Sequence, residues 1–297
     1  MVKVLITGSS GQVGSCLVKQ LQSWPEIEFL AVDRNKLDIT SEQDVIKTVN
    51  DFLPTIIINA AAHTAVDKAE DEVELSYAIN RDGPKYLAQA AEKVGAAILH
   101  ISTDYIFSGD KQGLYSESDS VSPQGVYGES KLAGEEAVIN ACPRHIILRT
   151  AWVFGEDGNN FVKTMLRLAK QRDSLGIVAD QFGGPTYAGD IAAALIKIAK
   201  TITDSKNTFN IGDYGIYHFS GLPHVSWFNF AQVIYDKAVT QGVLIKSPDV
   251  KGIKTEEYPT PAKRPANSTL NTNKITTVFN IPASNWQSAL DHLVDYV

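Results

Sequence analysis

The first 150 residues predict an α/β fold built on a parallel sheet. Short apolar, β-branched segments alternate with longer segments in which apolar residues recur at helical spacing. The apolar segments show little alternation of polar and apolar residues, which is typical of strands covered on both faces. A glycine-rich turn separates the first apolar segment from the first helical one. Together these observations predict a doubly wound parallel sheet of the Rossmann type, with a smaller, partly interleaved C-terminal lobe.

The expected elements follow one another in order along the N-terminal half. Strands are expected at 2–7, 28–32, 55–59, 97–102 and 145–150. Helices are expected at 13–21, 41–52, 78–94 and 127–142. Ser41 is a suitable N-cap for the second helix, because Asp44 follows three residues later, and Pro54 breaks the helical pattern after it.

After about residue 155 the pattern is less regular. Helices are expected at 160–171, 190–200 and 228–238, a strand at 208–211 and an extended loop over 247–272. We expect one domain over 1–150, to which a later segment at about 206–250 returns. The rest of 151–297 then forms most of the second lobe.

Composition excludes several classes of protein. A net charge of −7 over 297 residues argues against a nucleic-acid partner, because phosphate contacts need a surplus of Lys and Arg. No segment has the roughly 20 apolar residues that cross a bilayer, and the N-terminus lacks the pattern of a signal peptide. Two cysteines allow no disulfide framework, and the six histidines show no metal-ligand spacing. We expect a cytoplasmic protein with no membrane partner and no metal.

The turn after the first strand predicts a dinucleotide-binding site. Gly8, Gly11 and Gly14 lie between that strand and the first helix. Glycines permit strained backbone angles and let a pyrophosphate approach the main chain, where the helix N-terminus supplies free N–H groups. Residues 1–150 are therefore expected to bind the dinucleotide, and the C-terminal lobe to bind the substrate.

Residues after the second and third strands extend this site. Asp33 is placed to accept hydrogen bonds from the adenosine ribose, whereas Arg34 is suited to a 2′-phosphate, so the residues leave both NADH and NADPH open. Asp38 and Ile39 are candidates for contacts with the adenine. The small side chains of 60–62 leave space for a cofactor across the strand ends.

Tyr127 and Lys131 are candidate catalytic residues. They lie four residues apart at the start of an expected helix and so share a face. A nearby ammonium is expected to lower the pKa of the phenol, which is otherwise about 10. Thr103, at the carboxyl end of the fourth strand, is placed to bond the reacting oxygen. These residue types predict proton transfer by Tyr127 coupled to hydride transfer from a nicotinamide.

Longer motifs carry a resemblance to a known family. The segments 59–70, 102–107, 126–135, 149–154, 159–161 and 264–268 resemble the dTDP-4-dehydrorhamnose reductases, which are extended short-chain dehydrogenases/reductases. The resemblance runs from residue 1 to about 275, apart from 213–227. It implies NADPH- or NADH-dependent reduction of the 4-keto group of dTDP-4-dehydro-L-rhamnose. The product, dTDP-L-rhamnose, serves O-antigen and cell wall polysaccharide synthesis.

The resemblance also implies roles for individual residues. The catalytic residues would be Thr103, Tyr127 and Lys131. The cofactor would be held by Gly8, Gly11, Gln12, Val13, Gly14, Asp33, Arg34, Asp38, Ile39, Ala61, Ala62, Thr64, Tyr127 and Lys131. The nucleotide-sugar would be held by Val66, Thr103, Asp104, Tyr105, Tyr127, Trp152 and Arg264, with Trp152 against the apolar face of the sugar and Arg264 on the diphosphate.

Two alternatives stay open at this point. One is another nucleotide-sugar keto-reductase, and a second is a non-catalytic regulatory subunit resembling the β subunit of methionine adenosyltransferase. A dehydratase or epimerase is disfavoured, because Tyr105 stands where dehydratases carry a carboxylate after Thr103 and Asp104.

Some family members bind magnesium at a dimer interface, but Ser15 and Cys16 stand in place of one ligand here. A monomer or a homodimer formed without metal is therefore expected.

Overall fold

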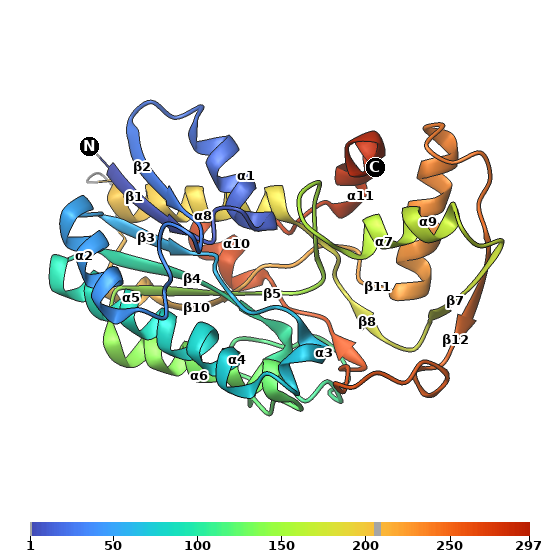
Figure 1. Cartoon of the computed structure of the whole chain (residues 1–297), viewed down its shortest axis with the longest axis horizontal. Helices are drawn as coiled ribbons and strands as arrows, with labels where there is room; N and C mark the ends of the chain where they lie inside the picture. Colours follow the sequence, from blue (N-terminus) through green and yellow to red (C-terminus); the bar gives the residue numbers. More distant parts are fainter. Residues whose placement is uncertain (1, 205–208) are drawn as a thin grey trace.

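A six-stranded parallel sheet forms the centre of the molecule (Figure 1). The computed structural model describes residues 2–204 and 209–297. Across the sheet the strands are β2 (Ile27–Val32), β1 (Val2–Thr7), β3 (Ile56–Asn59), β4 (Ala97–Thr103), β5 (His145–Thr150) and β10 (Gly215–His218). All neighbouring pairs run parallel. The doubly wound, Rossmann-type prediction is confirmed.

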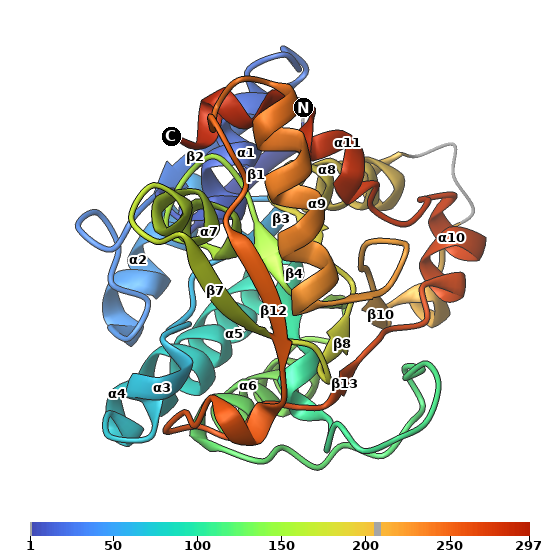
Figure 2. The same cartoon turned by 90° about the vertical axis from the view of Figure 1, so that its right-hand side faces the viewer.

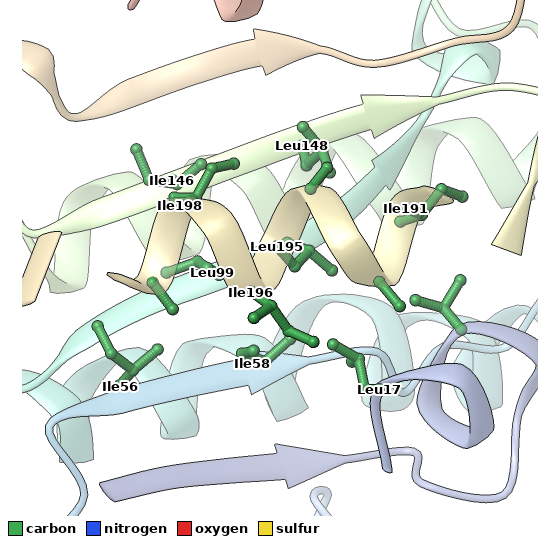
Figure 3. Packing of buried hydrophobic residues seen from close by; sticks show 14 of the residues in the cluster. Leu17, Ile56, Ile58, Leu99, Ile146, Leu148, Ile191, Leu195, Ile196 and Ile198 are labelled. Carbon is green, nitrogen blue, oxygen red and sulfur yellow. The ribbon is translucent and has the colours of Figure 1, made fainter. Parts of the chain in front are cut away.

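Helices cover both faces of this sheet. One face packs against α1 (Gln12–Leu21), α8 (Ala188–Thr203) and α10 (Asn273–Phe279). The other packs against α2 (Glu42–Phe52), α5 (Gly83–Val94) and α6 (Val126–Ala141). Because side chains alternate along a strand, Ile56 and Ile58 join the first core and Ile57 the second. Figure 3 shows the first core, with Leu195 and Ile198 of α8 lying against the strands.

The direction in which successive strands are added to the sheet reverses between β1 and β3. From β1 the chain moves outward to β2 and then returns to β3 on the other side. At such a point the turns that leave neighbouring strands diverge, and ligands of open α/β sheets bind there. The glycine turn after β1 and the alanines after β3 both lie at this position.

A second, smaller lobe lies beyond the carboxyl ends of these strands (Figure 1). Its helices α7 (Phe161–Ala169), α9 (Trp227–Thr240) and α11 (Trp286–Ala289) enclose a core that includes Phe154 and Phe230. Figure 2 shows α9 in front, next to the parallel pair β7 (Ser174–Val178) and β12 (Asp249–Ile253). The remaining strands are short: β6 (Val153–Phe154), β8 (Phe182–Gly183), β9 (Thr186–Tyr187), β11 (Val225–Ser226) and β13 (Asn267–Ser268).

The helix expected at 78–94 begins earlier and is irregular. After α3 (Val66–Ala69), the helical path starts with α4 (Val73–Tyr77), continues as a π-helix over Ala78–Asp82 and becomes α5 at Gly83. Pro84 stands at the second position of α5, directly after the π-helix, so the missing N–H of proline coincides with the change of helix type and the path continues. The π-helix turns Asn80 into the interior, where the side chain is fully buried.

Two sequence predictions in the C-terminal half are wrong. The strand expected at 208–211 begins outside the described residues, and its last residue, Ile211, starts a 3₁₀ helix (Ile211–Asp213), whereas the strand is β10. The extended loop expected over 247–272 contains β12, a 3₁₀ helix (Thr255–Glu257) and β13. In both cases strand pairing with distant segments decided the conformation. Two more 3₁₀ helices cover Asp104–Ile106 and Leu290–Tyr296.

The C-terminal half contributes to both cores. Of the segment 206–250 that was expected to return to the first domain, β10 lies in the sheet, while α9 packs in the second lobe. The helices α8 and α10 also pack on the sheet and lie outside that segment. None of the described helices is long and apolar enough to cross a membrane.

We predict that Gly134→Ala destabilises the fold. A Cβ at Gly134 would lie 2.0 Å from the Asn80 carbonyl oxygen, so α6 must shift away from the π-helix. The expected loss is about 1–3 kcal/mol in the free energy of unfolding, despite the better helix propensity of alanine. Urea denaturation measures it. At Gly212 an added Cβ meets nothing within 4 Å, so Gly212→Ala is the matched control, expected within about 0.5 kcal/mol of wild type. Equal stability of the two variants would contradict the prediction.

Candidate active site

The turn after β1 has no room for side chains at Gly8 and Gly14. Gly8 has φ +71°, and a Cβ there would lie 2.5 Å from the backbone nitrogen of Ala61. A Cβ at Gly14 would lie 2.1 Å from the Gly8 carbonyl oxygen. Gly11 precedes α1 as its N-cap, and no side chain caps the helix there. The first N–H groups of α1 are therefore available to an anion that reaches the bare main chain.

Asp33 faces this turn, whereas Arg34 does not contact it. One Asp33 carboxylate oxygen accepts hydrogen bonds from two backbone N–H groups of the turn after β2, and the other accepts from the Ser10 hydroxyl at 3.4 Å. The Arg34 guanidinium lies 3.8 Å from Asp38 and is exposed. Asp38 is also bound by Thr40, which together with Arg34 holds the pKa of its carboxyl below the usual value. Asp33 is thus the residue positioned next to the glycine turn.

Ile39 packs against the start of α5, and the loop after β3 is held by the Asn80 side chain. Ile39 is buried, and a Cβ at Gly83 would lie 2.5 Å from its Cδ1. The backbone of His63 is held at both its N–H and its carbonyl by the Asn80 side chain, at 2.8 and 3.1 Å. Asn80 also donates to Ser130 of α6 at 3.0 Å. Sequence analysis missed Asn80, because only the π-helix brings it between the loop and α6.

Gln12 and Val13 begin α1 at the opposite side of the turn. The Gln12 side chain accepts a hydrogen bond from Asn160 of the second lobe at 3.0 Å. Val13 is 8% exposed and packs in the core. The predicted cofactor residue Gln12 therefore also joins the two lobes.

Tyr127 lies at the start of α6, next to the end of β4. Its ring meets the Tyr105 ring edge-on at 5.4 Å between centroids. Burial raises the pKa of Tyr127 to about 12; the Thr103 hydroxyl lowers it and the Asp104 carboxylate raises it. The phenol is therefore protonated at neutral pH, which is the form that donates a proton.

Lys131 is buried on the same face of α6 and points into the sheet. Its Nζ donates to the Ile101 carbonyl oxygen at 2.7 Å and lies 3.4 Å from His100 Nε2. Burial lowers the pKa of Lys131 to about 8, while Glu135 raises it. The expected lowering of the Tyr127 pKa is not found in this structure, because the effect of burial dominates. The Lys131 ammonium is instead bound by the β4 backbone.

Asp104 and Thr103 form one hydrogen-bonded unit at the end of β4. Thr103 Oγ1 donates to Asp104 Oδ1 at 3.0 Å and accepts from the backbone N–H of Tyr105 at 3.2 Å. Burial raises the pKa of Asp104 to about 6, and the hydroxyls of Ser268 and Thr103 lower it. Burial also raises the pKa of Tyr105. Both phenols, of Tyr105 and Tyr127, therefore remain protonated at neutral pH.

A small pocket opens beside Tyr127. It is lined by Val66, Glu70, Tyr105, Phe107, Gln124, Gly125, Tyr127, Gly128, Ala262, Lys263 and Pro265. Glu70 Oε1 accepts from the first N–H of α6, at Val126, at 3.0 Å. Arg264, next to the pocket, pairs with Asp67 at 2.7 Å. The structure thus brings Val66, Tyr105 and Tyr127 together as predicted lining residues and adds Glu70, Gln124 and Lys263.

Trp152 is stacked face to face on Trp227. It adopts φ +50°, and its ring stacks on Trp227 with centroids 3.4 Å apart and planes 8° apart. Gly183 also lies close to this ring, because a Cβ there would be 2.4 Å from Trp152 Cε2. Trp227 comes from the segment 213–227 that departs from the family pattern, which is why the motifs did not reveal it.

The residues present fit a dinucleotide with a nicotinamide. A bare glycine turn, an uncapped helix start and Asp33 lie at the β1 end of the crevice, and Thr103, Tyr127 and Lys131 lie at the β4 end. Within 2–204 and 209–297, no group of three or more His, Cys, Asp or Glu side chains could hold a metal ion. The arrangement suits proton transfer next to a hydride donor.

Known proteins match this chain over its whole described length. The family model described as "RmlD substrate binding domain" matches residues 2–297. A dTDP-4-dehydrorhamnose reductase from Aggregatibacter actinomycetemcomitans is 53% identical over 100% of this chain and 99% of that protein. A reductase of that name from Clostridium acetobutylicum has a solved structure with a TM-score of 0.89 and 40% identity, covering 99% of both chains.

A second solved structure was determined with a cofactor. This dTDP-4-dehydrorhamnose reductase from Bacillus anthracis, in complex with NADP, has a TM-score of 0.88 and 37% identity and covers 100% of both chains. The resemblance seen in the motifs is therefore confirmed over the full sequence. The chain belongs to the family of the RmlD substrate binding domain, whose relatives above are dTDP-4-dehydrorhamnose reductases.

Proposed function

We propose that this chain reduces the 4-keto group of dTDP-4-dehydro-L-rhamnose to give dTDP-L-rhamnose, with NADPH or NADH as reductant. The observation that carries the proposal is the phenol of Tyr127, which lines a pocket beside Thr103 and keeps its proton at neutral pH, in a chain that matches named reductases end to end. The relative with NADP supports the cofactor class. Another nucleotide-sugar keto-reductase would use the same chemistry and differ only in the sugar it accepts.

The cofactor supplies the hydride when it is bound. The residues that would hold it are Gly8, Gly11, Gln12, Val13, Gly14, Asp33, Arg34, Asp38, Ile39, Ala61, Ala62, Thr64, Tyr127 and Lys131. In this set, Asp33 is the group positioned by hydrogen bonds to face an adenosine ribose. The Lys131 ammonium uses one of its three protons on the Ile101 carbonyl and would donate another to the other ribose.

Tyr127 acts as the general acid in this proposal. It donates its phenolic proton to the carbonyl oxygen of the sugar, and its raised pKa keeps that proton in place until then. Thr103 donates a hydrogen bond to the same oxygen once it turns from Asp104. The positive charge of Lys131 stabilises the phenolate that remains. Val66, Asp104, Tyr105, Trp152 and Arg264 complete the proposed sugar-nucleotide site.

The nucleotide end of the substrate would lie along the pocket toward residues 262–265. Arg264 is held by Asp67, and the Lys263 ammonium contacts Gln124 at 3.1 Å. These two cations lie beside the pocket of a chain with net charge −7. A diphosphate would therefore be bound by local positive charge and not by the overall field of the protein.

A catalytic protein accounts for the site better than a regulatory subunit. Thr103 and Lys131 are both buried, which costs free energy that a cofactor-binding scaffold alone would not require. We also propose a cytoplasmic location, because the thiols of Cys16 and Cys142 are both free. The protein would act as a monomer or homodimer.

The direct test is oxidation of NADPH and NADH with dTDP-4-dehydro-L-rhamnose as the oxidant. We expect turnover with this keto-sugar, followed as loss of absorbance of the reduced nicotinamide. Other nucleotide keto-sugars, tested at equal concentration, are expected to react more slowly. Faster turnover of one of them would replace the proposed substrate, and no turnover with any would favour the regulatory alternative.

Tyr127→Phe is expected to lower kcat at least about 100-fold, because the general acid is removed. The matched control is Tyr235→Phe, since Tyr235 is a buried tyrosine of the second lobe whose hydroxyl bonds only Met165 among the described contacts. That variant should keep kcat within about twofold of wild type, since neither proton transfer nor substrate binding involves it. Steady-state kinetics of both variants decide the matter, and near-normal turnover by Tyr127→Phe would exclude it as the acid.

A chelator should leave the oligomeric mass unchanged. Ser15 and Cys16 replace a carboxylate that some relatives would use for magnesium, and the described residues form no metal-binding cluster. Light scattering before and after EDTA measures the mass. A shift from dimer to monomer on chelation would show that other ligands build a metal-dependent interface.

A further inference from the structure

Three polar side chains form a row across the interior of the sheet. Thr7 of β1 is in register with Asn59 of β3, and Asn59 is in register with His100 of β4. All three are buried, with at most 1% of each residue exposed. They lie on the face that packs against α6, where the preceding row, Leu5, Ile57 and Ile98, is apolar. Polar groups placed so deeply must be satisfied by one another.

The amide of Asn59 has only one orientation that satisfies its neighbours. Its Oδ1 accepts from the Thr7 hydroxyl at 2.7 Å and from the backbone N–H of Ala61 at 3.1 Å. A backbone N–H is always a donor, so the atom facing it must be the oxygen. The Nδ2 group therefore faces His100 Nδ1, at 3.0 Å.

This orientation determines which nitrogen of His100 carries the proton. Because Asn59 Nδ2 donates to Nδ1, Nδ1 must be the acceptor. Burial, together with the nearby Lys131 charge, lowers the pKa of His100 well below its usual value, so the ring is neutral. A neutral imidazole with an unprotonated Nδ1 carries its proton on Nε2. That Nε2–H group lies 3.4 Å from Lys131 Nζ.

The Nε2–H group of His100 interacts differently with the amine and the ammonium forms of Lys131. The neutral amine has a lone pair that accepts the Nε2–H group, whereas the ammonium has only donors to offer. We propose that His100 is a positioning residue that acts through Lys131: it favours the amine over the ammonium and so sets the pH above which Lys131 loses its charge. The inference deepens the proposed function and rests on it for the part that Lys131 plays in catalysis.

Three other groups influence whether Lys131 carries a charge: Glu135, its partner Arg149 and the Ile101 carbonyl. Glu135, one turn further along α6, favours the ammonium. It is itself paired with Arg149 of β5 at 2.7 Å, with both side chains at most 3% exposed, and this partner offsets its charge. The Ile101 carbonyl accepts from either form of Lys131. From β4, then, His100 is the titratable side chain in contact with Nζ among the described residues.

The tautomer can be observed without any assay of activity. The full-length protein, labelled with ¹⁵N in its histidines, is studied by long-range ¹H–¹⁵N correlation spectra from pH 6 to 9. The His100 signals are assigned by their loss in His100→Gln. We expect the Nε2–H tautomer, with no titration over this range. A proton on Nδ1, or protonation of the ring in this range, would overturn the proposal.

The second measurement is the alkaline limb of the kcat profile. A reaction that needs the ammonium keeps its full rate below the pKa of Lys131, about 8, and loses it above. His100→Leu removes the donor, so the limb should move to higher pH by roughly half a unit or more, while KM for the keto-sugar changes little. His100→Asn, which is shorter and lacks a donor at the Nε2 position, should shift the limb in the same direction if His100→Leu fails to fold.

Two variants separate positioning from mere packing. His100→Gln retains an N–H group near the place of Nε2, and we expect it to retain the wild-type limb. His218→Leu is the matched control, because His218 is another fully buried histidine of the same sheet, bonded through Nδ1 to the Tyr115 carbonyl at 3.2 Å. It should lose stability with no shift of the limb. A wild-type limb in His100→Leu and His100→Asn, or an equal shift in His218→Leu, would overturn the proposal.

Failure of the proposed function would remain distinguishable. If the wild-type protein reduces no keto-sugar, the proposed activity fails while the tautomer spectra still test His100. Binding of NADPH, followed by its fluorescence against pH in wild type and His100→Leu, then replaces the kinetic profile. The expected result is again weaker binding at high pH with the midpoint displaced upward in the variant, and coincident curves would contradict it.

Discussion

The close seating of α6 against its neighbours is the constraint on which the site depends. Glycines permit it at two places: a Cβ at Gly128 would lie 2.3 Å from the Tyr105 carbonyl oxygen, and one at Gly134 would lie 2.0 Å from that of Asn80. This contact carries Lys131 out of solvent and leaves Tyr127 only partly exposed. Their shifted pKa values are therefore consequences of helix packing, and a looser helix would leave both groups with ordinary acidity.

The two ends of the crevice communicate through hydrogen bonds and not through apolar contacts alone. Asn80 connects the loop after β3 with Ser130, the residue before Lys131. Asn59 connects the end of β1 with β4 and also receives the N–H of Ala61, at the edge of the glycine turn. Ala61, proposed to contact the cofactor, and Lys131, proposed for catalysis, are thus connected through Asn59 and His100.

Much of this could be predicted from local sequence, but not all of it. The glycine turn, the strand that ends in Thr103 and the helix that begins near Tyr127 are determined by short-range patterns, and the structure shows each of them. The π-helix around Asn80, the stacking of Trp227 on Trp152 and the bond from Lys131 to Ile101 depend on residues far apart in the chain. No sequence motif singles out His100, and only strand register reveals its contact with Lys131.

The way the chain returns to the sheet has a consequence for its synthesis. The face of the sheet that carries Ile56, Ile58 and Leu99 is covered by α8 and α10, and α10 ends only at Phe279. A nascent chain that has completed β5 at Thr150 therefore still exposes an apolar surface of native strands. Vectorial folding from the ribosome cannot finish the first domain before nearly the whole polypeptide has emerged, so the two lobes must complete their folding together.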